Sequence, residues 1–338
     1  MSRAQLTSTV EQNTGGAVAP FVAGKNKVIN GDFGIWQRGT SFTALVNGTY
    51  TADRFYYNRD GSGSTVTVSQ QTFAPGTAPV AGYESAYYYQ HAQTVAGTGG
   101  SYNTLDTKIE DVRTFAGQTV TLSFWAKGDA ARTISVNVNQ NFGSGGSGGV
   151  SYNFGSITTT TSWARYSLTY TLPSIAGKTI GTGSNIQIDM LFPVNTVMTI
   201  SLWGLQLEAG SVATPFTTAS GTLQGELALC QRYYYREAYS GGYTGYMLGY
   251  YDSSTDATFV WRLPQTMRTS PSFNASSYTQ FIFYDTGNRF PSAGPSLQFA
   301  QPSAVTFTMT TSGATAGQGV ILRNYATSSS YLEASAEL

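Results

Sequence analysis

The sequence predicts an all-β protein with a jelly-roll sandwich, followed by a short helix and a second, smaller β-sandwich domain. Seven or more short segments alternate apolar and polar residues, which is the period of a half-buried strand. From residue 27 to about residue 218, turn-rich spacers and no helical pattern separate these segments, as in an antiparallel sandwich. A single helical pattern then begins near residue 223, and alternation returns after it.

These changes of pattern divide the 338 residues into three parts. Residues 1–26 are polar and small, without periodicity, and are expected to form an N-terminal arm that either stays disordered or orders on a larger partner. Residues 27–218 are expected to form the jelly roll. Residues 219–338 are expected to form a linker helix and a C-terminal β domain.

The predicted strands of the jelly roll follow from strict alternation. In "QTVTLSFWAKGD" the apolar side chains on one face are Val120, Leu122, Phe124 and Ala126. The segments "RTISVNVNQNF", "SWARYSLTYTL" and "SNIQIDMLF" alternate in the same way. In "VMTISLWGLQLE" the apolar phase shifts at Trp203–Gly204, which predicts a β-bulge. The segment "GSGGSGG", residues 143–149, lacks the Lys and the helix of a phosphate loop and is expected to connect two strands.

The opening stretch "KVINGDFGIWQRGTSF", residues 27–42, is expected to be architectural. Val28 and Ile29 are expected to start a strand that turns at Asn30. Three apolar residues are expected to close one end of the core: Phe33, Ile35 and Trp36. A charged set is expected to pin the entry of the strand by pairing: Arg38, Asp53 and Arg54.

The helical pattern in "LQGELALCQRYYYREA" places four residues on one face: Leu223, Leu227, Cys230 and Tyr234. Their spacing of four, three and four residues fits a helix that begins or links the second domain. After it, segments such as "TFVWRL" and "AVTFTMT" alternate again, and prolines lie between these segments.

The low charge of the chain narrows the range of partners. Charged residues are 11% of the sequence, with 18 Lys and Arg against 18 Asp and Glu. Nucleic acids and anionic membranes require a basic surface, so neither is an expected partner. The chain shows no signal-peptide pattern and no apolar run long enough to span a membrane. We therefore expect synthesis in a host cytoplasm and no membrane insertion.

The sequence offers little for catalysis or metal binding. His91 is the single histidine and Cys230 the single cysteine, which excludes the usual zinc sites and any intrachain disulfide. We interpret His91 as a satisfied structural histidine and Cys230 as a buried packing residue. A carboxylate pair could still cleave a glycosidic bond, but no spacing pairs the candidates: Asp53, Glu84, Asp106, Glu110, Asp111, Asp189, Glu208, Asp252 and Asp256. The sequence therefore predicts neither an enzyme nor a cofactor.

The aromatic content is high, with 23 tyrosines. The segment "YSGGYTGYMLGYYD" holds five of them among glycines, namely Tyr239, Tyr243, Tyr246, Tyr250 and Tyr251. Tyrosine combines an apolar face with a polar tip, which suits stacking on sugar rings. These residues are the candidate glycan-binding site, although core or subunit-interface packing would explain them equally well.

Several sequence segments, taken together, resemble those of a known family. "NKVINGDFGIWQRGTSF", "YTADRFYY", "GQTVTLSFWAKGD", "TTSWARYSLTYTLP" and "LWGLQLEAGSVATPF" occur in this order. They resemble the carbohydrate-binding-module-like jelly rolls of bacteriophage tail fibres and related virion proteins. The C-terminal "ELALCQRYYYR", "WRLPQTMRTSPSF" and "LEASAEL" resemble the terminal domain that follows such jelly rolls.

The resemblance implies a non-catalytic tail fibre of the virion that binds bacterial surface polysaccharide for host adsorption. It also implies a homotrimer that docks on other virion proteins through residues 1–26. The alternatives are a head fibre or capsid decoration protein, and a surface-polysaccharide depolymerase. Related modules often hold a structural Ca²⁺ with a Glu after "NGDF" and an Asp in the final strand. Gly34 and the segment "LWGLQ" occupy these positions here, so no metal is expected.

Overall fold

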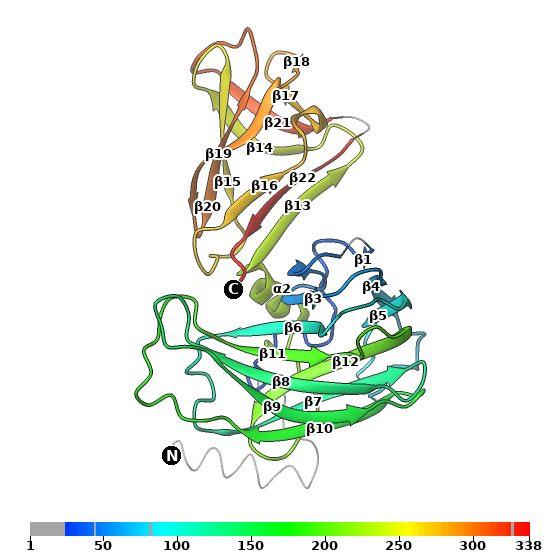
Figure 1. Cartoon of the computed structure of the whole chain (residues 1–338). Coiled ribbons are helices and arrows are strands. Elements are labelled where there is room, and N and C mark those ends of the chain that lie inside the picture. The colour runs from blue at the N-terminus through cyan, green and yellow to red at the C-terminus, as the bar shows by residue number, and fades with distance from the viewer. Residues whose placement is uncertain (1–23, 44, 81–82, 326–327) are drawn as a thin grey trace, which may run out of the picture. The chain divides into compact units, whose positions relative to one another are not determined.

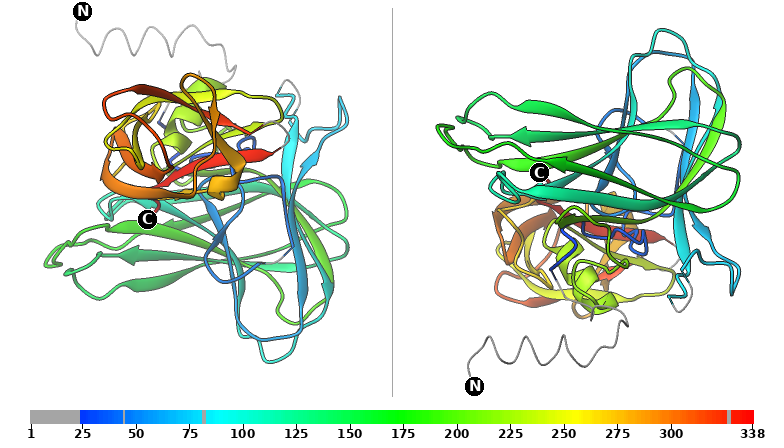
Figure 2. Two further views of the ribbon diagram at one scale, coloured as in Figure 1. Left: turned by 90° about the horizontal axis from the view of Figure 1, so that it is seen from above. Right: turned by 90° about the horizontal axis from the view of Figure 1, so that it is seen from below.

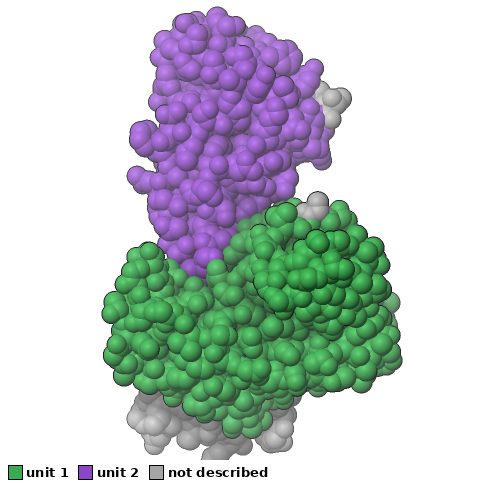
Figure 3. Space-filling model, viewed as in Figure 1, with its two compact units in different colours: residues 1–226 green, residues 227–338 purple. Residues whose placement is uncertain are grey.

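The computed structural model describes residues 24–43, 45–80, 83–325 and 328–338. It is an all-β structure that divides into two compact units, unit 1 (residues 1–226) and unit 2 (residues 227–338), shown in Figure 3. The boundary lies inside a short helix, α2 (Leu223–Gln231). The predicted arm at residues 1–26 lies almost entirely outside the described residues.

Unit 1 consists of two six-stranded antiparallel sheets, visible as stacked layers in Figure 1 and seen from above and below in Figure 2. Sheet A contains, in spatial order, β1 (Ser41–Phe42), β4 (Thr65–Thr72), β5 (Tyr87–Val95), β12 (Met198–Ala209), β7 (Thr119–Gly128) and β10 (Ala164–Thr171). Sheet B contains β2 (Thr49–Tyr50), β3 (Phe55–Arg59), β6 (Asn103–Glu110), β11 (Asn185–Leu191), β8 (Thr133–Asn141) and β9 (Val150–Thr158).

The core of unit 1 lies between the two sheets and confirms the predicted alternation. Sheet A contributes Val120, Leu122, Phe124 and Ala126 from β7, and sheet B contributes Ile134, Val136 and Val138 from β8. Successive side chains of a strand point to opposite faces. The outward faces of both sheets therefore carry the intervening residues.

The predicted bulge in β12 is confirmed. The register between β12 and β7 shifts between Trp203 and Gln206. Gly204 has a φ of 68°, and a Cβ built on it would lie 2.8 Å from the ring of Trp125. Glycine is therefore the residue that this position accepts without strain or a clash. The bulge lets Trp203 point outward while Leu205 returns to the core between the sheets.

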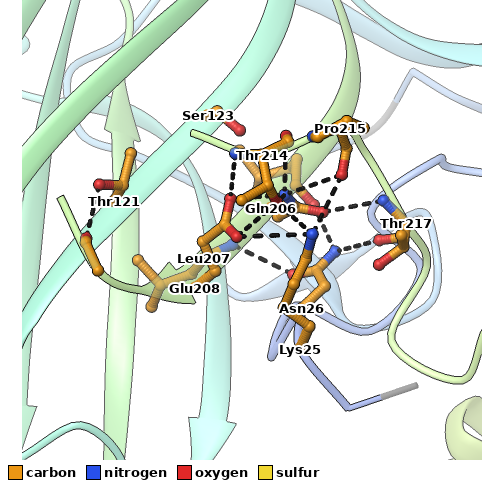
Figure 4. Close-up of polar contacts among 12 residues, drawn as sticks. Lys25, Asn26, Thr121, Ser123, Gln206, Leu207, Glu208, Thr214, Pro215 and Thr217 are labelled. Carbon is orange, nitrogen blue, oxygen red and sulfur yellow. Dashed lines mark hydrogen bonds and ion pairs between the residues drawn. The ribbon is translucent and has the colours of Figure 1, made fainter. Parts of the chain in front are cut away.

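A buried polar network ties the start of the described chain to β12 (Figure 4). The Asn26 side-chain amide donates to the carbonyls of Leu205 and Thr217, at 3.0 Å each. Its oxygen accepts from the backbone N–H of Val28 at 2.9 Å and of Leu207 at 3.1 Å. All four hydrogen bonds join the Asn26 side chain to backbone groups, so they hold this segment in place without strand pairing. The predicted strand at Val28–Ile29 is wrong, because residues 28–32 form bends and turns.

Unit 2 is the second, smaller β-sandwich. Its three-stranded sheet contains β13 (Tyr234–Ser240), β22 (Ser329–Ser335) and β16 (Ser272–Ala275). Its seven-stranded sheet contains β18 (Asn288–Arg289), β17 (Phe281–Tyr284), β21 (Gly319–Asn324), β14 (Gly245–Tyr251), β15 (Asp256–Arg262), β20 (Ala304–Thr310) and β19 (Ala293–Gln301). A 3₁₀ turn, η1 (Tyr278–Gln280), precedes β17. One core cluster joins Leu332 and Ala334 of the small sheet to Phe259 and Phe307 of the large one.

The predicted helical face is correct in part. Helix α2 carries Leu223, Leu227 and Cys230, but it ends at Gln231. Tyr234 is the first residue of β13, and its backbone pairs with Ser335 of β22. Pairing with the C-terminal strand ends the helix earlier than the apolar spacing alone predicts.

Candidate glycan-binding site

The five candidate tyrosines of unit 2 do not form one platform. Tyr251 is fully buried, with its ring against Phe283 at a centroid distance of 6.2 Å. Its hydroxyl donates to Asp285 at 3.3 Å. Burial leaves Tyr251 no free face for a sugar ring, which corrects the prediction for this residue. Tyr246 is half-buried, and its hydroxyl is bonded to Ser330 at 2.6 Å.

The other three tyrosines point in different directions. Tyr239 packs edge-on against Tyr246 at 4.5 Å and donates its hydroxyl to Glu237 at 3.0 Å. Tyr243 is 48% exposed in the turn before β14, and Tyr250 is 50% exposed on the outward face of β14. A glycan-binding role for these residues stays a prediction, and the geometry offers two separate exposed rings.

The three charged residues expected to pin the entry of the jelly roll are Arg38, Asp53 and Arg54, and they make different contacts. Arg38 Nη1 lies 3.8 Å from Asp53 Oδ1, and Asp53 also accepts the backbone N–H of Gln37 at 3.0 Å. Arg54 is buried and donates to the carbonyl oxygen of Lys108 at 2.8 Å. The structure thus brings Arg38 and Asp53 together and joins Arg54 to strand β6.

A continuous row of polar and aromatic side chains crosses the outward face of sheet B. The backbone register pairs neighbouring residues of this row on six successive strands. In spatial order they are Tyr50, Tyr56, Asp106, Asp189, Asn137 and Asn153. Strands lie about 4.8 Å apart, so the row extends over roughly 24 Å. We call this row and its hydrogen-bonded neighbours the sheet-B face.

Two carboxylates form the centre of the sheet-B face, and amide side chains surround them. Asp106 accepts from Asn58 Nδ2 at 2.6 Å. Asp189 accepts from Asn139 Nδ2 at 2.6 Å and from Gln187 Nε2 at 2.7 Å. The amides hold the carboxylates in fixed orientations, and their remaining polar atoms can face a ligand. Such convergent acceptors and donors match the hydroxyl groups of a sugar.

The two carboxyl groups lie at directly paired positions on adjacent strands. Burial, followed by the negative charge of Asp189, raises the pKa of Asp106 to about 7. Burial likewise raises the pKa of Asp189. Neighbouring like charges disfavour ionisation of both groups at once, so Asp106 keeps its proton to a higher pH than a free carboxyl does. Asp106 is buried and its Oδ1 has no hydrogen-bond partner within the described residues, whereas Asp189 is partly exposed.

Aromatic rings lie at the other end of the row. Tyr56 contacts Tyr50 with a centroid distance of 5.2 Å. The ammonium of Lys108 lies 5.1 Å from the centroid of the Tyr56 ring. At the opposite margin of the face, Ser135 and Leu191 line an open hollow of about 430 Å³. Because Ser135 and Leu191 are register partners next to the central row, the hollow continues the sheet-B face.

Sequence reasoning missed this face, although one signal was present. The segment "SVNVNQN" places Asn137, Asn139 and Asn141 at alternate positions, opposite the apolar set that predicts the strand. A row of amides on an otherwise ordinary strand is typical of a face that contacts hydroxyl groups. The pairing of Asp106 with Asp189 depends on the strand order β6–β11–β8, which no local pattern gives.

His91 and Cys230 are both buried, as predicted. The interpretation of His91 as satisfied is wrong in detail. Its Nδ1 has no hydrogen-bond partner within the described residues, and its Nε2 lies 3.5 Å from Asn103 Nδ2. Burial lowers the pKa of His91 to about 3, so the ring is neutral at physiological pH. A neutral ring tolerates this environment because it packs against Phe192 at 4.8 Å.

Two further findings concern the described part of the chain. It holds no cluster of three or more His, Cys, Asp or Glu side chains suited to a metal ion. None of its helices has the length and apolarity needed to cross a membrane.

Comparison with known proteins finds a carbohydrate-binding family over part of unit 1. Residues 80–184 match the family described as "Carbohydrate binding domain" (CBM_4_9). This segment includes strands β5 to β10 and thus Asp106 and Asn137 of the sheet-B face. The sequence has no significant match among curated proteins.

Solved structures with a similar fold include carbohydrate-binding modules and a phage protein. A structure described as "CBM4 structure and function" has 19% identity and a TM-score of 0.34, and the match covers 54% of this chain and 98% of that chain. A putative sugar binding protein from Bacteroides thetaiotaomicron has 13% identity and a TM-score of 0.36, with coverages of 55% and 100%.

The enzymatically active domain of tailspike protein 4 from bacteriophage CBA120 has 15% identity and a TM-score of 0.35. That match covers 55% of this chain and 22% of the tailspike chain, so this chain spans about a fifth of the tailspike's length. At these TM-scores, no ligand or activity is transferred to this chain from any of the three.

Proposed function

We propose that this protein is a non-catalytic, glycan-binding fibre protein of a bacteriophage virion and that the sheet-B face binds bacterial surface polysaccharide. The observation that carries the proposal is the row from Tyr50 to Asn153, with two paired carboxyl groups at its centre. The match of residues 80–184 to a carbohydrate binding domain supports it independently.

The chemistry of the face favours a neutral glycan. Carboxylate and amide oxygens accept from sugar hydroxyls, and amide N–H groups donate to them. A sugar that carries its own carboxylate would meet the negative charge of the Asp106–Asp189 pair, which is repulsive at short range. We therefore assign neutral hexose-based polysaccharide as the ligand class of this face.

The same pair does not suit glycoside hydrolysis. Glycosidases hold two carboxyl groups about 5 to 9 Å apart, so that the scissile bond or a water fits between them. Asp106 and Asp189 instead occupy directly paired positions on adjacent strands, where amide side chains hold both carboxyl groups. We therefore propose binding without cleavage and treat a depolymerase as an outcome of the test.

The role in a virion rests on the ordered phrases that resemble phage fibre proteins and on the low charge of the chain, at 11% charged residues. Contacts that do not depend on charge are not screened by salt, which suits a particle outside the cell. We propose docking through residues 1–26. A homotrimer is favoured by α2, where Leu223 is 69% and Leu227 37% exposed. Light scattering that gives a monomer at micromolar concentration would contradict the trimer.

A glycan array probed with the full chain tests the binding function. We expect saturable binding to a narrow set of neutral bacterial glycans. Asn137→Ala should weaken binding about three- to tenfold, because it removes the free amide at the centre of the row. Asn274→Ala is the matched control, since it removes an exposed strand amide from unit 2. Equal effects of the two changes would overturn the proposed site. Release of reducing sugar would overturn the non-catalytic role.

Particle assembly tests the virion role separately. Deletion of residues 1–23, which leaves the buried Asn26 network in place, should block incorporation into phage particles and leave cell binding by the free protein intact. If particles lacking the protein still adsorb to host cells, the protein is a head fibre or decoration protein rather than the adsorption fibre.

A further inference from the structure

The outward face of sheet A carries an aromatic cluster of a different kind. Four buried aromatic side chains form a small second core on this face: Phe73, Trp125, Trp203 and Phe216. Their partly buried neighbours include Tyr88 and Trp163, which lie at the margin of the cluster. Trp163 is thus the tryptophan of the chain with the greatest exposure, because the other four are buried.

Tyr88, Trp163 and Lys127 form an open corner at this margin. The rings of Tyr88 and Trp163 are nearly perpendicular, with an interplanar angle of 84° and a centroid distance of 5.3 Å. The ammonium of Lys127 lies 5.4 Å from the Tyr88 ring and 5.2 Å from the Trp163 ring. Phe73 supports both rings from below, at 4.7 Å and 5.5 Å.

The cation of this corner has no carboxylate partner within the described residues, because none of their ion pairs includes Lys127. Tyr88, Lys127 and Trp163 are each half-buried, so part of each side chain is exposed to solvent. The corner therefore combines two partly exposed aromatic rings with a cation.

The backbone register extends the corner into a polar row. Ser69, Gln90, Ser201 and Lys127 are successive partners on β4, β5, β12 and β7. The side-chain amide of Gln90 reaches Ser201 at 3.5 Å. A ligand that stacks on Trp163 can thus find further hydrogen-bonding groups along the same direction.

We propose that Trp163, Tyr88 and Lys127 form a second ligand site, distinct from the sheet-B face, that binds a sugar residue carrying a carboxylate. The aromatic faces stack against the C–H groups of the sugar ring. The ammonium pairs with the sugar carboxylate, and a charge-assisted bond of this kind is about twice as strong as a neutral one. Uronic acids and nonulosonic acids both present this chemistry.

The charge contrast separates the two sites. The sheet-B face holds the carboxyl groups of Asp106 and Asp189, whereas the corner on sheet A holds the ammonium of Lys127. A polysaccharide with alternating neutral and acidic residues could therefore engage one molecule at both faces, although each site is testable by itself.

Fluorescence quenching of the full-length protein tests the proposal directly. Acrylamide reaches exposed indoles first, so quenching reports mainly on Trp163. Oligogalacturonate should protect Trp163 and bind saturably, while its methyl ester, which lacks the charge, should bind at least tenfold more weakly. A second comparison measures binding of sialyllactose, which carries a nonulosonic acid, against binding of lactose, which does not. Comparing the two pairs of probes shows whether the site prefers a nonulosonic acid or a uronic acid.

Two variants localise the effect. Lys127→Met keeps the aliphatic stem and should weaken binding of the acidic oligosaccharide about tenfold. Trp163→Phe keeps a stacking ring and should weaken it less. Lys178→Met is the matched control, because Lys178 also lies beside an aromatic ring, 5.8 Å from Phe142, but on an exposed loop.

The outcomes of this test can be distinguished from the outcomes of the glycan-array test of the sheet-B face. Asn137→Ala should leave acidic-sugar binding at the corner unchanged. The proposal is overturned if Lys127→Met and Lys178→Met behave alike, if the methyl ester binds as tightly as the acid, or if neither acidic probe protects Trp163 from quenching.

Discussion

The two outward faces of unit 1 arise from the same sandwich and the same alternation of side chains, yet they differ in chemistry. The sheet-B face presents amides around a buried carboxyl pair. The face of sheet A presents the packed rings of Trp125 and Trp203, covered in part by Val80, Tyr83 and Phe216. The difference lies in which connecting segments cover the outward face of each sheet.

Cover by connecting segments explains the contrast. The segments after β4 and after β12 supply Val80 and Phe216 to the aromatic cluster, so apolar side chains on sheet A gain a second buried environment. In the six-strand row of sheet B, Tyr56 and Asp106 are buried, whereas Asp189 and Asn137 are partly exposed and Asn153 is exposed. We propose that a ligand binds this exposed part of the row, whereas on sheet A the covered rings mainly stabilise the fold.

The largest expected effect on the free energy of unfolding comes from disrupting the aromatic cluster on sheet A. Trp203→Ala should lower the free energy of unfolding by about 3 to 5 kcal/mol, because Trp203 is fully buried and contacts Trp125 at 5.2 Å and Phe216 at 4.9 Å. Chemical denaturation measures it. Trp203→Phe should be milder, since the buried indole N–H has no partner to lose. Equal losses for both would show that the cluster is not tightly packed.

The next effect concerns the bulge that points Trp203 outward. Gly204→Ala should lower the free energy of unfolding by about 2 to 3 kcal/mol, because it combines a positive φ with a Cβ 2.8 Å from Trp125. Gly221→Ala, with a φ of 78° and open space around it, isolates the backbone part of the effect. If the two losses are equal, the close approach to Trp125 has no energetic consequence.

The sheet-B face should respond to pH in a direction that the aromatic face does not. The raised pKa of Asp106 means that the folded protein binds more protons than the unfolded chain between about pH 4 and pH 7. The contribution of Asp106 to stability is therefore fully present at low pH and falls as pH rises through this range. The lowered pKa of buried His91 contributes in the opposite direction between about pH 3 and pH 6.5. Denaturation curves of the wild type and of Asp106→Asn at several pH values isolate the contribution of Asp106.

Asp106→Asn sharpens this prediction. The amide can still accept from Asn58 and, like the protonated carboxyl, carries no charge beside Asp189. At pH 8 the variant should be more stable than the wild type by about 2 kcal/mol, and the gain should vanish near pH 4. A gain that is independent of pH would show that ionisation of Asp106 is not its cause.

The fold was largely predictable because its signals are local. Alternation in β7, β8, β10 and β11 and the phase shift at Trp203–Gly204 identified the strands and the bulge. The strand predicted at Val28–Ile29 failed because the side chain of Asn26 binds the backbone of that segment, and a polar network of this kind has no periodic signature. Likewise, α2 ends early because Tyr234 pairs with Ser335, about a hundred residues further along the chain.

The candidate site was harder to predict for the same physical reason. The tyrosine-rich segment is conspicuous in composition, but alternation along β14 sends Tyr250 outward and Tyr251 into the core. The sheet-B face consists of residues from six strands that are ordinary one at a time. Only the order of the strands places Asp106, Asp189 and Asn137 side by side.

The smallest expected effect tests how little the sheet-B face contributes to stability. Asn141 donates to Asn185 at 3.1 Å in a partly buried pair on this face. Asn141→Ala should lower the free energy of unfolding by about 0.5 to 1 kcal/mol, the usual contribution of one neutral hydrogen bond. A loss comparable to that of Trp203→Ala would mean that the sheet-B face is a structural element rather than a binding surface.

Hydrogen–deuterium exchange of the full chain, with and without the neutral glycan selected on the array, tests the central claim most directly. The account predicts ligand-dependent protection in peptides from β6, β8 and β11, which carry Asp106, Asn137 and Asp189, and unchanged exchange at residues 239–252. Protection confined to residues 239–252, with β6, β8 and β11 unchanged, would contradict the account and place the glycan on the tyrosine-rich segment of unit 2.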